Sequence, residues 1–268
     1  MPIETNRSRV TVEELVTRCR REMIPLTNTF SYFSAVPLVE DEVRQYLQEP
    51  IAALPPAIAA ELPPIGVLLV PYLEKGEVRT RTEAQRKAGD GEHDHSHGRG
   101  AGENRVEYVV FERPPESRQI FSSRVASEEG LTLVFAIKEE DVADYHYSFY
   151  AEIASLVAEN WKPEARDLYY RLLREELKLE VHGEVDERSW HLKQGLLRRQ
   201  SNIRKETKLF RDYASQSFED TLTLYLHGLC CDIEVETGPR QLPSRYLRKR
   251  LEALHSLYQP PEGYAVFP

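Results

Sequence analysis

The stretch IGVLLV, at residues 65–70, is the longest apolar run of the chain. A membrane-spanning helix needs about 20 apolar residues, and the first residues, MPIETNRSRVTVEEL, lack the apolar segment of a signal peptide. A short apolar run that follows a pair of prolines is instead typical of a strand. Residues 65–70 therefore predict a sheet near the middle of the chain, and we expect no membrane-spanning segment.

Three further segments carry the apolar and β-branched residues of strands. They are residues 105–112, 119–125 and 131–138. The connections PPES and SEEG between them have the length and residue types of hairpin turns. With residues 65–73 as the first strand, they predict a small antiparallel meander of about four strands. Residues 74–104 interrupt it and are rich in charge, glycine and histidine, so we expect a mobile insertion there.

Helical patterns lie on both sides of these strands. Thr11 and Glu14 have the spacing of a capping box, which predicts a helix that ends before Pro25. A shorter helix is expected over residues 39–48. After the strands, apolar residues recur with a helical period. The helices expected there begin near Asp141 or Asp144, at Pro163, near residue 206 and near Ser244.

The order of these patterns predicts an α+β protein that forms a single domain over residues 1–268. We expect N-terminal helices (1–62), then the antiparallel sheet (63–138), and last a C-terminal helical bundle (140–258). Of the 268 residues, 41% are hydrophobic, and the formal net charge is -9. This charge disfavours nonspecific binding of the whole surface to nucleic acid or to an anionic membrane. The three cysteines, two of them adjacent, are a poor disulfide framework, so we expect a cytoplasmic protein with reduced thiols.

A histidine-rich tract, GDGEHDHSHGRG at residues 89–100, is the first candidate metal site. His93, His95 and His97 alternate with other residues, and neutral imidazoles bind Zn, Ni and Cu. In composition the tract resembles the histidine-rich loops of some metal transporters and metallochaperones. A hydrophilic insertion with incidental metal affinity is the alternative, because a loop without supporting contacts is a poor catalytic scaffold.

An acidic stretch, ELKLEVHGEVDERSWH at residues 176–191, is the second candidate. If the stretch is one helix, its carboxylates recur every three or four residues and share a face. Such a face can hold a divalent metal, with His182 and His191 as ligands. Glu180 or Glu184 would then be the base that accepts a proton. The glycine within the stretch can break the helix, and a solvated acidic face balanced by arginines is the alternative.

The third candidate is FEDTLTLYLHGLCCDIEVE, at residues 218–236. Asp220, His227 and Cys231 are seven and four residues apart, so on a helix they share a face. All three are side chains that bind zinc. If this helix packs against the acidic stretch, its ligands can meet the imidazoles of that stretch in one joint site. Alternatively, the two adjacent cysteines are small buried hydrophobic residues.

Basic residues are concentrated in LLRRQSNIRKETKLFR, at residues 196–211. They are Arg198, Arg199, Arg204, Lys205, Lys208 and Arg211. Such residues can neutralise phosphates, although no aromatic pattern of an RNA-binding sheet accompanies them. A solvated linker that pairs with the acidic helices is the alternative.

We therefore expect a helix-borne site for a divalent metal, with zinc as the leading candidate. If the chain is an enzyme, hydrolysis by a metal-activated water is the expected reaction, because it needs only a few ligands, an open position and a base. The competing expectation is a noncatalytic interaction protein that contacts a protein or nucleic-acid partner through its basic helices. The sequence has no G-x-S-x-G, Walker A or G-x-G-x-x-G motif, which argues against the corresponding hydrolases and nucleotide folds.

Overall fold

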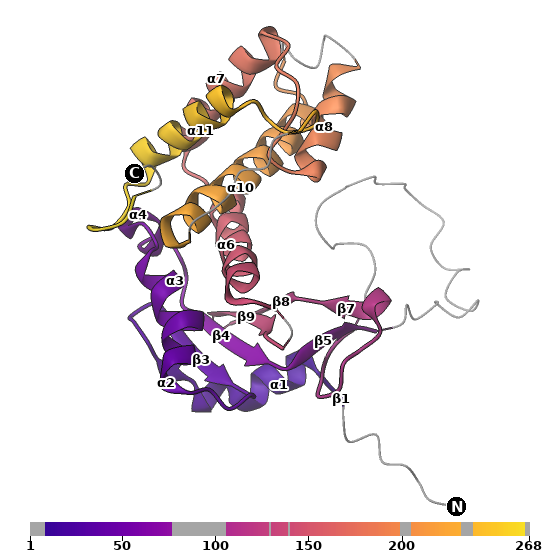
Figure 1. Cartoon of the computed structure of the whole chain (residues 1–268), viewed down its shortest axis with the longest axis vertical. Coiled ribbons are helices and arrows are strands. Elements are labelled where there is room, and N and C mark those ends of the chain that lie inside the picture. The colour runs from indigo at the N-terminus through magenta and orange to yellow at the C-terminus, as the bar shows by residue number, and fades with distance from the viewer. Residues whose placement is uncertain are drawn as a thin grey trace, which may run out of the picture. The chain divides into compact units, whose positions relative to one another are not determined.

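The computed structural model describes residues 9–76, 106–128, 130–138, 140–198, 205–231 and 238–265 (Figure 1). Backbone contacts divide the chain into two compact units. Unit 1 is Met1–Pro37 with Ile65–Glu139, and unit 2 is Leu38–Pro64 with Glu140–Pro268. Each unit is therefore built from two separate stretches of the sequence, whereas the sequence patterns pointed to one domain with consecutive parts.

The strands of unit 1 form two sheets, and helices make up unit 2, which confirms the predicted α+β class. Sheet A is antiparallel and has the order β1-β6-β5-β7. Its strands are β1 (Arg9–Thr11), β5 (Tyr72–Lys75), β6 (Glu107–Val110) and β7 (Gln119–Ile120). A four-stranded antiparallel sheet is thus present, but its strands differ from those of the predicted meander. Strand β1 takes part in place of residues 131–138, and β6 and β7 both pair with β5 and not with each other.

Sheet B was not predicted, and it has the order β2-β3-β4-β9-β8. Its strands are β2 (Ile24–Pro25), β3 (Phe30–Ser34), β4 (Ile65–Val70), β8 (Ser122–Ser127) and β9 (Gly130–Ala136). β4 pairs in parallel with both β3 and β9. The strand predicted over 65–73 is therefore divided between two sheets at Pro71, which has no N–H to donate to a neighbouring strand. The β8–β9 hairpin at SEEG has the predicted antiparallel pairing.

The first helix of unit 1 packs on the strands. Helix α1 (Val12–Cys19) begins where the Thr11 hydroxyl accepts a hydrogen bond from the Glu14 N–H at 3.2 Å, so the predicted cap is confirmed. The helix ends in a 3₁₀ turn, Arg20–Glu22, and a second such turn, Glu116–Arg118, precedes β7. Apolar side chains of α1 and both sheets share one buried core. It includes Val12, Val16, Leu68, Leu73, Val109 and Val134.

Unit 2 is helical in both of its stretches. The first contains α2 (Glu40–Val43), a π-helix (η2, Arg44–Gln48), α3 (Glu49–Ala52) and α4 (Pro56–Ala59). The second contains α6 (Val142–Glu159), α7 (Pro163–Lys178), α8 (Glu187–Leu197), α10 (Lys208–Cys230) and α11 (Ser244–Leu257). Two predicted starts are confirmed, because the Asp141 carboxylate accepts from the Asp144 N–H at 2.9 Å and Pro163 opens α7.

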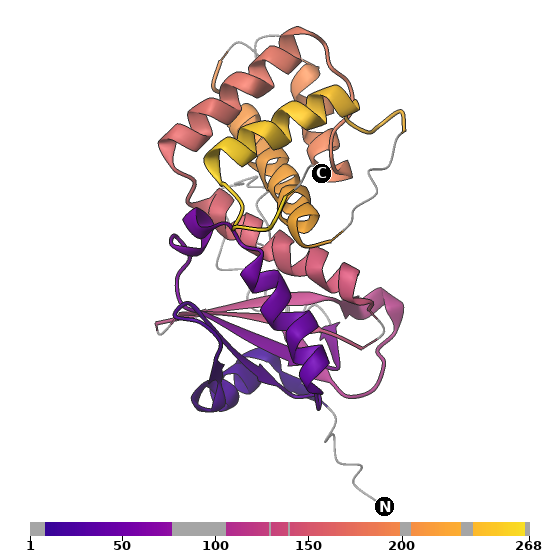
Figure 2. The ribbon, with the colours of Figure 1, turned by 60° about the vertical axis from the view of Figure 1, so that its left-hand side comes forward.

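Helix α10 is the central element of unit 2. It contacts α6, α7, α8 and α11, and Figure 2 shows α11 lying beside α7. Large side chains along α10, among them Tyr213, Phe218 and Leu222, are fully buried. Its contacts with α6 bring the last turn of α10 next to the first turns of α6. None of the helices among the described residues is long and apolar enough to cross a membrane.

The acidic stretch 176–191 is not one helix, so the condition on which its shared carboxylate face depended is not met. Helix α7 ends at Lys178, and α8 begins only at Glu187. Glu180 and Gly183 between them have φ values of 54° and 79°. A Cβ atom on Gly183 would lie 2.1 Å from the carbonyl oxygen of Gln241, so the chain needs glycine both for this conformation and for this close approach.

Candidate metal centre

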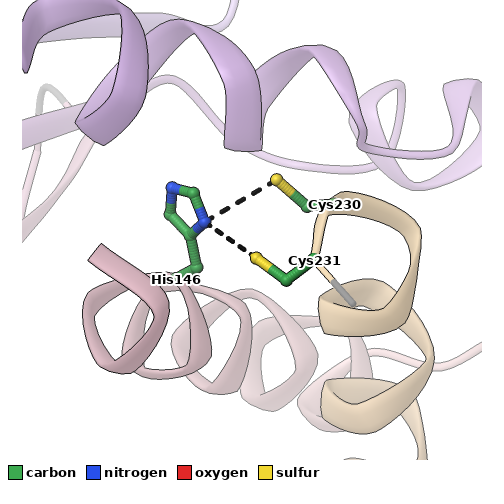
Figure 3. A group of neighbouring side chains, drawn as sticks. All are labelled: His146, Cys230 and Cys231. Atoms are coloured by element: carbon green, nitrogen blue, oxygen red, sulfur yellow. Dashed lines mark hydrogen bonds between the residues drawn. The ribbon is translucent and has the colours of Figure 1, made fainter. Parts of the chain in front are cut away.

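Three side chains of unit 2 that ordinarily bind metals meet at the end of α10. Figure 3 shows His146 of α6 with its Nδ1 facing the sulfurs of Cys230 and Cys231. The three ligand atoms lie within 4.8 Å of one another. Within the described part of the chain, no other group of three or more His, Cys, Asp or Glu side chains comes this close.

The way α10 ends explains how two adjacent cysteines can face one imidazole. Cys230 is the last helical residue, and Cys231 has φ -127° and ψ 148°, which is extended backbone. The Cys231 N–H still donates to the His227 carbonyl at 2.9 Å. Successive side chains in a continuous helix point about 100° apart. The change to extended backbone at Cys231 instead places both sulfurs beside the ring of His146.

Helix α6 buries His146 in a stripe of aromatic side chains. The residue is only 3% exposed, and Phe149 and Tyr150 lie three and four positions further along the same face. Both ring nitrogens have partners. Nδ1 lies 3.1 Å from the sulfur of Cys231 and 3.7 Å from that of Cys230. Nε2 lies 2.7 Å from the carbonyl oxygen of Gln45.

The Gln45 contact determines which nitrogen of His146 can bind a metal. A carbonyl oxygen only accepts, so Nε2 of His146 carries the hydrogen and donates it. The lone pair of the neutral ring is then on Nδ1, which faces the two sulfurs. Histidines that bind metals typically donate their other N–H to a carbonyl or carboxylate in this way, because the contact fixes the orientation of the ring.

The π-helix and a proline leave the Gln45 carbonyl free for this role. In a π-helix each carbonyl accepts from the N–H five residues later, and the Glu49 N–H bonds the Arg44 carbonyl in this way. The corresponding donor for Gln45 would be Pro50, which has no N–H. The carbonyl therefore has no partner within its own helix, and the Nε2–H of His146 supplies one.

The electrostatics of the group favour a deprotonated thiol. The pKa of Cys230 is lowered to about 4, first by its hydrogen bond with Cys231, against burial, and then by hydrogen bonds with His146 and Tyr150. Burial, the largest effect on His146, lowers its pKa, but hydrogen bonds with Cys230 and Gln45 outweigh it and raise the pKa above its ordinary value. The lowered pKa of Cys230 thus favours its thiolate, the form that binds metals. The group can hold a metal ion.

One of the ligands predicted from the sequence, Cys231, belongs to this group. His227 and Asp220 lie earlier on the same helix and are not among its three ligand atoms. The pKa of His227 is lowered, first by burial and then by His146. Burial raises the pKa of Asp220 to about 7, and the Gln216 amide donates to its carboxylate at 2.6 Å.

The other predicted imidazoles of the joint site do not join the group. His182 follows α7, and His191 lies on α8. Both are exposed, and Nε2 of His191 lies 3.5 Å from the carboxylate of Glu187. Among the described residues the structure does not bring these two imidazoles together with Asp220 and His227. The break in the acidic stretch explains this, because it removes the shared helix face on which the joint site depended.

The two predicted bases have different surroundings. Glu180 is exposed in the turn after α7. Glu184 is buried, and its carboxylate accepts from Lys193 at 2.9 Å, from Arg250 at 2.7 Å and from the Tyr213 hydroxyl. Neither lies in the group of three ligands, and their role as bases stays a prediction.

The histidine-rich tract, with His93, His95 and His97, lies outside the described residues, as do Arg199 and Arg204 of the basic segment. Their proposed binding of metal or phosphate therefore stays a prediction.

Sequence reasoning missed His146. The signal that could have found it is a histidine within an aromatic run, YHYSFY, on a helix whose other buried side chains are almost all apolar or aromatic. Comparisons of the chain with protein-family models, with curated proteins and with solved structures found no match. The function is therefore inferred from the geometry of this group.

Proposed function

We propose that unit 2 is a zinc-binding unit in which His146, Cys230 and Cys231 hold the ion. The observation that carries the proposal is that Nδ1 faces both sulfurs while Nε2 is held by a backbone carbonyl. Zinc bonds sulfur at about 2.3 Å and nitrogen at about 2.0 Å, so its tetrahedral ligand atoms lie roughly 3.5 Å apart. The separations of 3.1 and 3.7 Å between Nδ1 and the sulfurs are close to this value.

The charge at this end of α10 also favours a cation. The C-terminus of a helix carries about half a negative charge, because its last carbonyls all point the same way. Helix α10 ends at Cys230, so its dipole raises the energy of an unbound thiolate there and lowers that of a bound cation. Reduced thiols are a condition of this site, and the three cysteines are free. We therefore also propose a reducing compartment such as the cytoplasm.

Three protein ligands leave one position of a tetrahedral zinc open, as in catalytic zinc sites. Cys230 and Cys231 are partly exposed, so we expect a water or a small substrate to reach that position. Hydrolysis by a metal-activated water is the reaction class that this arrangement supports. Hydrolysis of an activated ester by the zinc-loaded protein, and its loss in C231S, is the measurement that checks the reaction.

The metal site itself is tested with protein purified without a histidine tag, in a background in which His93, His95 and His97 are replaced by Gln. We expect this protein to retain one zinc ion per chain. C231S should weaken zinc binding by more than about 100-fold, because loss of a supporting partner alone costs about 10- to 100-fold. C19A, which removes the cysteine of unit 1, is the matched control and should bind zinc normally. The cobalt-substituted protein should show thiolate-to-metal charge-transfer absorption.

Two outcomes contradict the metal site. One is that all zinc is lost when the three histidines of the tract are replaced. The other is that C231S keeps the affinity and the charge-transfer absorption of the parent protein.

A second candidate function follows from the low pKa of Cys230, about 4. A thiolate beside an imidazole can act as a nucleophile. The two functions differ in their response to metal. If Cys230 is a nucleophile, iodoacetamide should alkylate it quickly in the metal-free protein, and the rate should depend on His146. Hydrolysis of the activated ester should then continue in the presence of a chelator. The negative end of the α10 dipole disfavours a free thiolate at Cys230, so we prefer the metal site to the nucleophile.

A further inference from the structure

His227 lies on α10 three and four residues before the two cysteines, on the same face of the helix. The centre of its ring is 5.7 Å from that of Tyr147 and 6.4 Å from that of Tyr150. The ring of His146 is also 6.4 Å from the ring of Tyr150. The two imidazoles therefore pack against the same tyrosine, beside the proposed metal.

The Nε2 atom of His227 is buried and has no hydrogen-bond partner among the described residues. The ring does have a hydrogen bond with the backbone of Ala143, and this bond must involve the other nitrogen, Nδ1. A carbonyl accepts, so Nδ1 carries the hydrogen and Nε2 presents a lone pair. A buried acceptor without a donor is uncommon in folded proteins, which points to a donor that the protein itself does not supply.

The position of His227 suits an indirect contact with the metal. It is not part of the group whose ligand atoms lie within 4.8 Å of one another. It nevertheless interacts electrostatically with both His146 and Cys230. In this arrangement His227 is therefore outside the set of three ligands but lies near two of them.

We propose that Nε2 of His227 accepts a hydrogen bond from the molecule in the fourth position of the metal. This inference rests on the proposed zinc site and names the ligands that the site selects. A ligand with a hydrogen to donate, such as water, hydroxide, an alcohol or an amine, satisfies the buried lone pair. An anion without a hydrogen, such as azide, leaves it unsatisfied. His227 therefore biases the open position toward water and toward hydroxyl- or amine-bearing substrates.

The test is a titration of the cobalt-loaded, full-length protein with azide, followed by visible absorption. H227F keeps a ring between the tyrosines but has no acceptor, and H227L is a second variant without an acceptor in case H227F does not fold. H227Q has an amide oxygen that can accept. H255Q, which changes an exposed histidine of α11, is the matched control.

We expect H227F to bind azide about 3- to 10-fold more tightly than the parent protein, because azide no longer displaces a hydrogen-bonded water. H227Q and H255Q should remain close to the parent value. All variants should keep one cobalt ion and unchanged thiolate-to-metal absorption.

Equal azide affinity in the parent protein and in the folded variant without an acceptor overturns the inference. So does loss of cobalt or altered charge-transfer absorption in that variant, since His227 would then be a ligand. Both results leave metal binding by His146, Cys230 and Cys231 standing, although a ligating His227 would fill the open position. Failure of the parent protein to bind cobalt or zinc at all contradicts the proposed function itself.

Discussion

Glu184 shows how a single buried charge depends on its neighbours. It lies between α7 and α8 and is 1% exposed. Its carboxylate is bound by Lys193, Arg250 and the Tyr213 hydroxyl, and Arg250 also binds Glu176 at 2.6 Å. Two carboxylates and two cations balance, so no net charge is buried. The network joins α7, α8, α10 and α11, and removing one member leaves an uncompensated charge in the interior.

This balance predicts how stability depends on pH. The pKa of Glu184 is lowered to about 2, because the attraction of Arg250 and Lys193 outweighs burial, the largest single effect, which raises it. A lowered pKa in the folded state means that Glu184 stabilises the fold fully above its unfolded pKa of about 4.3 and loses this contribution as pH falls toward 2. Urea unfolding of the parent protein should therefore show stability falling between about pH 5 and about pH 3.

E184Q supplies the comparison. It should lose about 3–5 kcal/mol near neutral pH, because Lys193 loses its carboxylate partner and Arg250 keeps only Glu176. It should also show a smaller loss of stability on acidification. E187Q, which changes an exposed glutamate of α8, should stay within about 0.5 kcal/mol of the parent protein. A pH dependence in E184Q as steep as in the parent protein would contradict the assignment.

At the scale of single residues, the group of His146, Cys230 and Cys231 could be predicted from the sequence only in part. Cys231 was found because its helical spacing from His227 can be read from the local sequence. His146 was not found from the sequence, because the residues that it contacts are distant in the chain. Cys231 is 85 residues after it and Gln45 is 101 residues before it. A pattern of neighbouring residues carries no information about contacts of that range.

At the scale of elements, the π-helix Arg44–Gln48 is the support of the proposed site. It contributes no side chain as a ligand. Its contribution is a carbonyl that Pro50 leaves without a donor and that the Nε2–H of His146 uses. A functional role for this irregular turn accords with the frequent occurrence of π-helical turns at functional sites.

Replacing Pro50 tests this role without touching a ligand. P50A restores an N–H that competes with His146 for the Gln45 carbonyl, so we expect zinc affinity to fall by about 10-fold, the lower end of the cost of losing a supporting partner. P56A, at the first position of α4, removes a proline that needs no N–H there and should leave zinc affinity unchanged. Competition with a chromophoric chelator measures both. Equal affinities in P50A and P56A would show that the proline has no such role.

The turn between α7 and α8 predicts how two glycine substitutions affect the stability of the protein. G183A should destabilise the protein by about 2 kcal/mol or more, because φ is 79° and the new Cβ would meet the Gln241 backbone. G195A, inside α8 where nothing lies within 4 Å of the new Cβ, should instead stabilise it by about 0.5–1 kcal/mol. Chemical denaturation compares the two. A mild effect of G183A would mean that the turn can move away from Gln241.

Helices whose first residues carry a capping side chain or a proline could be predicted from the sequence. Strands that pair with residues distant in the chain could not. The starts at Thr11, Asp141 and Pro163 follow from a side chain or ring acting on its own helix. Strand β3 was missed, because FSYFS is short and pairs in parallel with β4 some 35 positions further along the chain. The sequence patterns also suggested antiparallel neighbours for β4, since hairpin turns leave a signature in sequence and parallel pairing does not.

At the scale of the whole molecule, the proposed metal concerns one of the two units. All of its ligands, and the carbonyl that supports them, belong to unit 2. Zinc should therefore slow amide hydrogen exchange in η2, α6 and the end of α10, because a ligand that binds the folded state suppresses its opening. Exchange in β3, β4 and β9 should not change. C231S should show no zinc effect, and equal protection in both units would contradict this division.

The separation of these contacts along the chain has a consequence during synthesis. The carbonyl that orients the imidazole is made first, the imidazole 101 residues later, and the second sulfur 85 residues after that. A nascent chain that stalls or is cut before residue 231 has the anchor and the histidine but lacks a complete set of donors. The proposed ion would therefore be loaded only after translation has passed that codon, and its occupancy would be a late marker of maturation.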